Sequence, residues 1–209
     1  MKVNKYILYI ILFLIVICSA CDNTDKDMLS PEDYMKWVKE NDLLVKEQAL
    51  GAFIYSIRYL PDDYYLAKEF VSGNVLETQK EQDENELPSH ISFICKISTI
   101  DGSTSPIRYN VTSNEEYSYN LQYCSFNIAE DFVLVVGNDT MSCVNALCMR
   151  EYSVKPYNTI ILSFENITGK HFDLKKDMTV VYEDYLWGNG IIKFKIDKEN
   201  LNQIPLLNY

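Results

Sequence analysis

The chain contains few residues of the types that perform catalysis, and their spacing matches no familiar catalytic motif. Only two histidines occur, His90 and His171, and both are expected in surface loops. The sequence has no Gly-x-Ser-x-Gly elbow, no Walker loop, no Gly-x-Gly-x-x-Gly turn and no His-Glu-x-x-His zinc motif. We therefore expect a non-enzymatic protein, with no catalytic residues, no metal site and no bound cofactor.

Adjacent acidic residues are the other group that could do chemistry. The pairs are Asp62-Asp63, Glu115-Glu116 and Glu183-Asp184. Glycoside hydrolysis needs two carboxylates held across a cleft. Neighbouring residues in a strand point to opposite faces, so Glu183 and Asp184 cannot form such a pair with each other. Solvated surface acids are the favoured interpretation, and a hydrolase whose carboxylates meet only in the fold is a less favoured alternative.

Four cysteines lie well inside the chain: Cys95, Cys124, Cys143 and Cys148. The Cys-x4-Cys spacing of the last two has no second cysteine pair or histidine pair beside it, so it does not indicate zinc. In an oxidising compartment the four could form disulfides in three possible pairings, which the sequence cannot distinguish. The alternative is free thiols buried in a β-rich core, where cysteine is common.

A fifth cysteine, Cys21, stands at the end of a segment with the layout of a secretion signal. Lys2 and Lys5 form a basic start, an unbroken apolar run extends from Tyr6 to Ile17, and small residues precede Cys21 in the sequence Cys18-Ser19-Ala20-Cys21. These four residues resemble the bacterial lipobox, although Cys18 stands where Leu or Val is usual. The resemblance implies cleavage after residue 20 and a diacylglycerol and palmitate-type anchor on Cys21.

Two alternatives fit the residues less well than lipid on Cys21. Lipid on Cys18 would place the bulky Ile17 directly before the cut. A retained transmembrane anchor would need about 20 apolar residues, whereas Tyr6 to Ala20 supplies only fifteen. The expectation is therefore a lipid-anchored protein that contacts the bilayer through acylated Cys21, with a signal peptide over 1–20 and an acidic tether over 21–29.

Charge and composition restrict the partners of the remaining chain. Removing residues 1–20 from the 209-residue chain would leave 189 residues, and because two lysines and no acids are removed, the net charge would change from −11 to −13. Nucleic acids require a basic surface, so they are excluded as partners. The hydrophobic content of 47% predicts a compact core. An envelope protein or a glycan remains a possible partner.

Two short motifs resemble features of Gram-negative lineages that display lipoproteins on the cell surface. Acidic residues after the lipidated cysteine act there as an export signal, which the positions Asp22, Asp25, Lys26 and Asp27 resemble. This favours an outer-membrane location facing outward over a periplasmic orientation. Asp139-Thr140-Met141 is similar to the acceptor motif for O-glycosylation in those lineages, which would make Thr140 the modified residue.

The elements expected over residues 30–209 make one mainly β domain with a β-sandwich-like body. Ser30-Pro31-Glu32-Asp33 predicts the start of a short helix, because serine caps helices and proline suits the first turn. Residues 62–70 could form a second short helix, and a polar insertion near 72–89 is expected to be a loop or a solvated helix. Strands are predicted from their β-branched and aromatic content over residues 51–60, 90–99, 117–128, 132–136, 141–154, 158–165, 178–187 and 191–197.

The last two strands are expected to form a hairpin around Asn189-Gly190, a sequence that favours a two-residue turn. That turn would place Trp187 opposite Ile192 and Tyr185 opposite Phe194. Asp184 would then pair with Lys195 on the other face.

Beyond the lipobox, three stretches resemble an uncharacterised family of Bacteroidota-type outer-membrane lipoproteins. They are Leu29-Ser-Pro-Glu-Asp-Tyr-Met-Lys-Trp-Val38, Tyr59-Leu-Pro-Asp-Asp-Tyr64, and Asp139-Thr140 shortly before Cys143. The resemblance spans most of the chain and implies no assigned activity. The function expected is binding or scaffolding at the cell envelope, and the sixteen tyrosines and two tryptophans make a glycan-binding surface module the alternative.

Overall fold

The computed structural model describes residues 26–73, 90–149, 155–165 and 176–208. Most of the strands belong to one continuous antiparallel sheet with the order β2-β3-β4-β7-β6-β5-β8-β9. These strands are β2 (Val45–Leu50), β3 (Phe53–Leu60), β4 (His90–Thr99), β5 (Phe132–Val136), β6 (Asp139–Met149), β7 (Tyr157–Glu165), β8 (Met178–Asp184) and β9 (Gly190–Ile196).

Short helices and one small strand pair complete the described part of the chain; η marks a 3₁₀ helix. They are β1 (Met28–Leu29), α2 (Pro31–Glu40), η1 (Asp42–Leu44), α3 (Asp62–Val71), η3 (Pro106–Arg108), α4 (Asn114–Phe126), η4 (Ile128–Asp131), α5 (Lys198–Leu201) and β10 (Leu206–Leu207). Among the described residues, no helix combines the length and the apolar character that crossing a bilayer requires.

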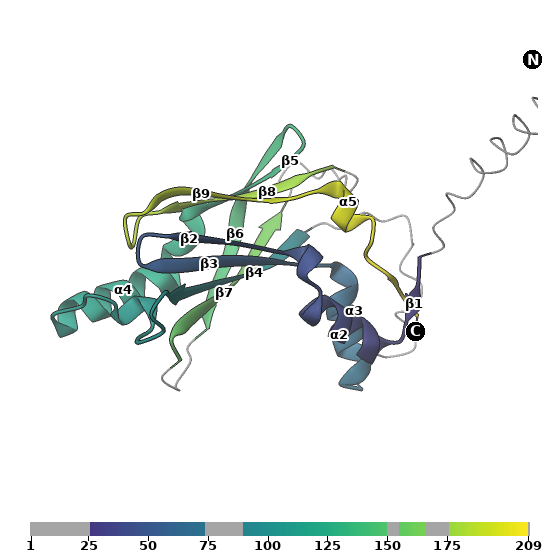
Figure 1. Cartoon of the computed structure of the whole chain (residues 1–209), viewed down its shortest axis with the longest axis horizontal. Coiled ribbons are helices and arrows are strands. Elements are labelled where there is room, and N and C mark those ends of the chain that lie inside the picture. Colours follow the sequence, from purple (N-terminus) through teal and green to yellow (C-terminus); the bar gives the residue numbers. More distant parts are fainter. Residues whose placement is uncertain (1–25, 74–89, 150–154, 166–175, 209) are drawn as a thin grey trace, which may run out of the picture.

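The sheet curls until its two edge strands, β2 and β9, lie side by side (Figure 1). The side-chain amide of Gln48 in β2 donates a hydrogen bond to the backbone oxygen of Lys193 in β9. β6 pairs with strands of both halves of the sheet, and its register shifts between Cys143 and Asn145. A bulge of this kind bends a strand and increases its twist, which helps the sheet to curl.

The curling follows from the pattern of buried residues. Buried and less buried positions alternate along β3, β7 and β8, as expected for strands with one face towards a core. The inner face carries large aromatic rings, among them Tyr55, Phe93, Phe132, Phe164 and Tyr182. The mainly β class is therefore confirmed, with two facing halves of a single sheet enclosing one core.

The two ends of the curled sheet carry different elements (Figure 1). At one end lie α2, α3 and the parallel pair of β1 with β10, which joins the N-terminal described segment to the C-terminal one. The other end of the sheet carries α4 and the β2–β3 turn. The chain therefore enters the fold at the end opposite α4.

Several predicted elements are confirmed. The helix after Ser30 spans Pro31–Glu40, and the Ser30 hydroxyl accepts a hydrogen bond from the backbone amide of Asp33 as an N-cap. The second predicted helix is α3, over Asp62–Val71. The strand predicted over 90–99 matches β4, and the one over 132–136 matches β5. Most of the 72–89 insertion and residues 150–154 lie outside the described residues.

The strand predicted over 117–128 is wrong, because this segment forms the helix α4. The Ser113 hydroxyl accepts a hydrogen bond from the backbone amide of Glu116, and the Glu116 carboxylate accepts one from the backbone amide of Thr112. This is a capping box shifted by one residue from its usual reciprocal partner, and it starts a helix. It overrides the β preference of the tyrosines that follow.

The register predicted for the last hairpin is also wrong. Asp184 pairs with Gly190 and Tyr182 pairs with Ile192, so residues 185–189 form a five-residue connection instead of a two-residue turn. The Asp184 carboxylate accepts hydrogen bonds from the backbone amides of Trp187 and Asn189, which holds this longer turn. In the observed register the buried Tyr182 lies opposite Ile192. The predicted register would have placed Trp187 opposite Ile192 instead.

Candidate functional site

The most heavily hydrogen-bonded side chain in the interior is Asp184, at the end of β8 and only 2% exposed. Its carboxylate accepts hydrogen bonds from the Tyr55 hydroxyl at 2.6 Å, the Asn189 side-chain amide at 2.8 Å and the Tyr182 hydroxyl at 3.2 Å. Together with the amides of the turn, these donors compensate for the loss of water around a buried charge. Burial, followed by the bond to Asp184, raises the pKa of Tyr55. The network fixes the β8–β9 turn and offers no open substrate position.

A second buried carboxylate, Asp131, ends η4 and is 4% exposed. Its Oδ1 accepts a 2.7 Å hydrogen bond from the Tyr123 hydroxyl of α4, while its Oδ2 has no hydrogen-bond partner among the described residues. Burial raises the pKa of Asp131 to about 6, the bond from Tyr123 lowers it, and the negative charges of Asp184, Glu130 and Glu183 raise it further. Asp131 therefore fixes the orientation of the Tyr123 ring.

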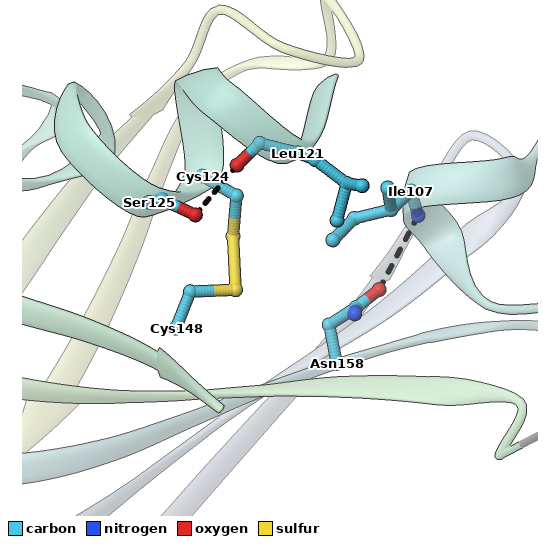
Figure 2. The surroundings of a disulfide bond; sticks show 6 residues. All are labelled: Ile107, Leu121, Cys124, Ser125, Cys148 and Asn158. Carbon is cyan, nitrogen blue, oxygen red and sulfur yellow. Dashed lines mark hydrogen bonds between the residues drawn. A yellow bond between two sulfur atoms is a disulfide. The ribbon is translucent and has the colours of Figure 1, made fainter. Parts of the chain in front are cut away.

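Helix α4 is attached to the sheet by a disulfide between Cys124 and Cys148 of β6, with 6.0 Å between the two Cα atoms (Figure 2). Beside it, the backbone amide of Ile107 in η3 donates a hydrogen bond to Asn158 of β7 (Figure 2). The two links hold α4 and η3 over the end of the sheet. Of the pairings that the sequence left open, the structure contains Cys124–Cys148, and Cys95 and Cys143 are buried free thiols.

The outer side of α4 borders a pocket of about 240 Å³, which we call the α4 pocket. Its lining residues are Tyr119, Gln122, Tyr123 and Asn127. The rings of Tyr119 and Tyr123 have centroids 6.1 Å apart and planes inclined by 40°. The two rings lie next to each other at an angle along the pocket, so they do not make the flat, coplanar platform expected of an extended aromatic binding face.

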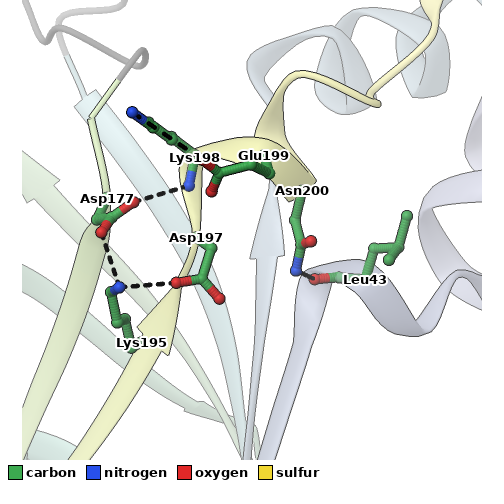
Figure 3. A network of polar contacts seen from close by, with 7 residues as sticks. All are labelled: Leu43, Asp177, Lys195, Asp197, Lys198, Glu199 and Asn200. Atoms are coloured by element: carbon green, nitrogen blue, oxygen red, sulfur yellow. Dashed lines mark hydrogen bonds and ion pairs between the residues drawn. The ribbon is translucent and has the colours of Figure 1, made fainter.

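A larger and more open pocket, of about 440 Å³, lies at the edge formed by β5, β8 and β9. It is lined by Val135, Gly137, Lys176, Asp177, Thr179, Lys195 and Lys198. Figure 3 shows the Lys195 ammonium between the carboxylates of Asp177 and Asp197, at 2.8 Å from each. These bonds raise the pKa of Lys195. The charge of Lys195 is therefore matched by two carboxylates, while Lys176 and Lys198 also line the pocket.

At the end of the sheet that carries α2 and α3, Asp62 and His90 approach to 4.0 Å between Oδ1 and Nε2. Burial raises the pKa of Asp62 to about 6, while the nearby His90 lowers it and Asp63 raises it. The Tyr34 hydroxyl of α2 is buried beside this group and has no hydrogen-bond partner among the described residues. These residues form a polar cluster where α2, α3 and β4 meet. Neither pocket described above includes any of them.

The residues predicted for export and anchoring fall mostly outside the described residues. Cys21, Asp22 and Asp25 lie there, whereas Lys26 and Asp27 are exposed at the start of the described chain. Thr140, the predicted O-glycosylation residue, is exposed near the start of β6. The described residues contain no group of three potential metal ligands, and the two pockets hold one carboxylate between them, Asp177. A carboxylate-dependent hydrolase thus gains no support from these pockets.

The α4 pocket was missed in the sequence because its residues were assigned to a strand. In a strand, Tyr119 and Tyr123 share a face with Leu121, whereas in a helix they share a face with Gln122. The signal that could have found it is the pair Ser113 and Glu116, which has the spacing of a capping box.

Comparison with known proteins assigns neither a family nor an activity. No protein-family model and no curated protein matches the chain. A crystal structure of a protein of unknown function from Burkholderia pseudomallei K96243 is similar to it, with 12% sequence identity and a TM-score of 0.35. The alignment covers 84% of this chain and 93% of that chain. At this identity and TM-score, the similarity carries no functional inference.

Proposed function

We propose that the protein is an exported lipoprotein, anchored through acylated Cys21, whose β-rich body has a non-enzymatic binding or scaffolding role at the outer membrane. The observation that carries the proposal is the sequence Ser19-Ala20-Cys21 at the end of a basic and then apolar segment. Lipidation of such a cysteine supplies enough hydrocarbon for stable membrane attachment.

The fold is compatible with attachment at one end. The backbone amide of Leu206 donates a 2.9 Å hydrogen bond to the carbonyl of Asp27, within the parallel pairing of β1 with β10. A tether that enters here would leave α4 at the far end of the body (Figure 1). A partner arriving from the aqueous side would then meet α4 first.

Membrane fractionation of cells that express Cys21→Ser tests the anchor. The wild-type protein should sediment with membranes and dissolve only in detergent. The intact mass of the variant should lack the mass that the attached lipid adds to the wild type. Ser19→Ala is a matched control, because it keeps a small residue before the cut and should leave attachment unchanged. A Cys21→Ser protein that carried the same lipid mass as the wild type would refute the proposed anchor.

The orientation and the modification are tested on the same cells. Protease added to intact cells should degrade an outward-facing body, and it should spare one that faces the periplasm. The intact mass of the purified protein should show added sugar that disappears in Thr140→Ala, since Thr140 is accessible in β6. Equal masses for both proteins would exclude glycosylation at this residue.

A glycan-binding role is the second candidate function, and the α4 pocket is the observation that favours it. Its lining combines two tyrosine rings with two side-chain amides, which suit the apolar face and the hydroxyls of a sugar.

A further inference from the structure

Helix α4 has one face that packs against the sheet and a second face that is largely exposed. Leu121 and Cys124 pack towards the sheet, and the Asn120 side-chain amide donates a hydrogen bond to the carbonyl of Ile107. The outer face carries a stripe at the spacing i, i+3, i+4 and i+7, which consists of Tyr119, Gln122, Tyr123 and Phe126. Tyr119 is 60% exposed and Phe126 is 76% exposed. Packing of the domain accounts for Tyr123 but does not explain the exposed rings of Tyr119 and Phe126.

The α4 pocket has one fixed wall and one adjustable wall. Tyr123 is fixed, because its hydroxyl is bonded to buried Asp131 and the next residue, Cys124, is tied to β6 by the disulfide. Tyr119 stands in solvent one helical turn away, with its ring inclined to that of Tyr123. A flat ligand can therefore lie against a positioned ring while the exposed ring adapts to it, which lowers the entropic cost of binding.

The lining side chains define the chemistry of the ligand. None of the four side chains is charged at neutral pH, so the pocket provides no ionic partner for an anion or a cation. The two rings offer apolar faces, while the amides of Gln122 and Asn127 each provide donors and an acceptor. A purely aliphatic ligand would leave these amides without partners, at a cost. A ring with an apolar face and a rim of neutral hydroxyls satisfies both groups.

We propose that the α4 pocket binds a neutral sugar ring, with one face of the sugar against the neighbouring rings of Tyr119 and Tyr123 and its hydroxyls on Gln122 and Asn127. The inference deepens the proposed function, and it rests on that function for the location of the ligand at the cell envelope. The volume of about 240 Å³ limits the contact to a single ring, so a terminal residue or one exposed unit of a polysaccharide is the substrate class.

The test uses the full chain, purified from whole-cell extract in detergent. Glucose, galactose, mannose and N-acetylglucosamine, and soluble polymers of each, serve as probes in saturation-transfer NMR and in affinity electrophoresis. At least one neutral sugar should receive saturation from the protein at its ring protons, and the soluble polymer of that sugar should retard the protein in the gel. Tyr119→Ala should weaken that binding by about fivefold or more, because it removes a stacking face, and Gln122→Ala should also weaken it.

Phe126→Ala is the matched control, because Phe126 is exposed on the same face of α4 but does not line the pocket. It should bind the sugar as the wild type does, and all variants should keep the wild-type melting temperature and circular dichroism. Three outcomes would overturn the proposal: no binding to any of the neutral probes, loss of binding in Phe126→Ala with Tyr119→Ala unaffected, or binding of tetramethylammonium in place of sugars.

Failure here is distinguishable from failure of the proposed anchor. The sugar experiment is carried out on the purified chain and does not depend on how the chain is attached, whereas the anchor is judged from the lipid mass and sedimentation of Cys21→Ser. If the protein carries no lipid but binds a neutral sugar, the sugar site is supported and the proposed anchor is refuted. If the protein carries the lipid but binds none of the neutral sugars, the anchor is supported and the sugar site is refuted.

Discussion

The phenol of Tyr55 in β3 donates a 2.6 Å hydrogen bond to the buried carboxylate of Asp184 in β8, across the interior of the curled sheet. The two residues are 129 positions apart in the chain. The Asn189 side chain donates to both of them, at 2.7 Å to the Tyr55 oxygen and 2.8 Å to Asp184. This contact joins the two facing halves of the sheet near the strands that nearly close it.

Removal of the Tyr55 hydroxyl should therefore destabilise the fold. Tyr55→Phe takes one donor from a buried carboxylate and should lower the free energy of unfolding by about 1.5–3 kcal/mol, the usual range for hydrogen bonds to charged groups. Urea unfolding followed by circular dichroism measures the change. Tyr185→Phe is the control, since Tyr185 is 62% exposed, and it should unfold at the wild-type urea concentration. Equal midpoints for the two variants would contradict the role assigned to Asp184.

A side chain at position 51 should disturb the same network from the β2–β3 turn. Gly51 has a φ of +59°, and a Cβ placed there would overlap the Asn189 side-chain oxygen. Gly102 has a φ of +64° and open space around it, so Gly102→Ala measures the backbone strain alone, about 1–2 kcal/mol. Gly51→Ala should lose more stability than Gly102→Ala in thermal unfolding. If the two losses were equal, Asn189 would have moved aside without cost.

The disulfide should contribute measurably to stability because it closes a loop between residues separated by 24 positions. In the chain-entropy description, such a cross-link contributes about 3 kcal/mol. The double variant Cys124→Ser with Cys148→Ser should show a loss of that size, and a thiol reductant should lower the wild type to the same level. Reductant should leave the double variant unchanged.

The free thiols provide an independent check of the pairing. Burial raises the pKa of Cys143 to about 11 and also raises that of Cys95, so neither should react with Ellman's reagent in the folded protein. Both should react after denaturation without reductant. Rapid labelling of Cys143 in the native state would contradict its burial, and labelling of Cys124 or Cys148 after denaturation without reductant would show that another cysteine pair is formed.

Stability should depend on pH through Asp131. Its pKa is about 6 in the folded protein, above the ordinary value of 3.8, so the folded state binds this proton more tightly than the unfolded chain does. The contribution of Asp131 to the free energy of unfolding is fully present below about pH 4. It decreases as the pH rises through 6, by up to about 3 kcal/mol in all. Urea titrations at several pH values should show this slope, and Asp131→Asn should reduce it.

Asp62 contributes a second slope of the same sign in the same pH range, because its pKa is also raised to about 6. The Asp131→Asn variant should therefore retain part of the pH dependence, and adding Asp62→Asn should reduce it further. If the stability of Asp131→Asn depended on pH as steeply as that of the wild type, the pKa of Asp131 would not be raised by burial.

The sequence alone predicted the elements whose signals are local. Ser30 and Pro31 gave the start of α2, and the run His90–Thr99 predicted β4, because capping and β preference depend on neighbouring residues. The same kind of local signal at Cys21 leads to the proposed anchor.

Tertiary structure decided what depends on residues far apart in the chain. The register of the last hairpin is set by the bonds that Asp184 makes to Tyr55 and Asn189, so the Asn-Gly turn preference is overruled. The pairing of Cys124 with Cys148 required α4 to lie over β6. The α4 pocket has both kinds of cause. The helical period, which is local, places Tyr119, Gln122 and Tyr123 together. The burial of Asp131 in η4, which only the fold provides, fixes the ring of Tyr123.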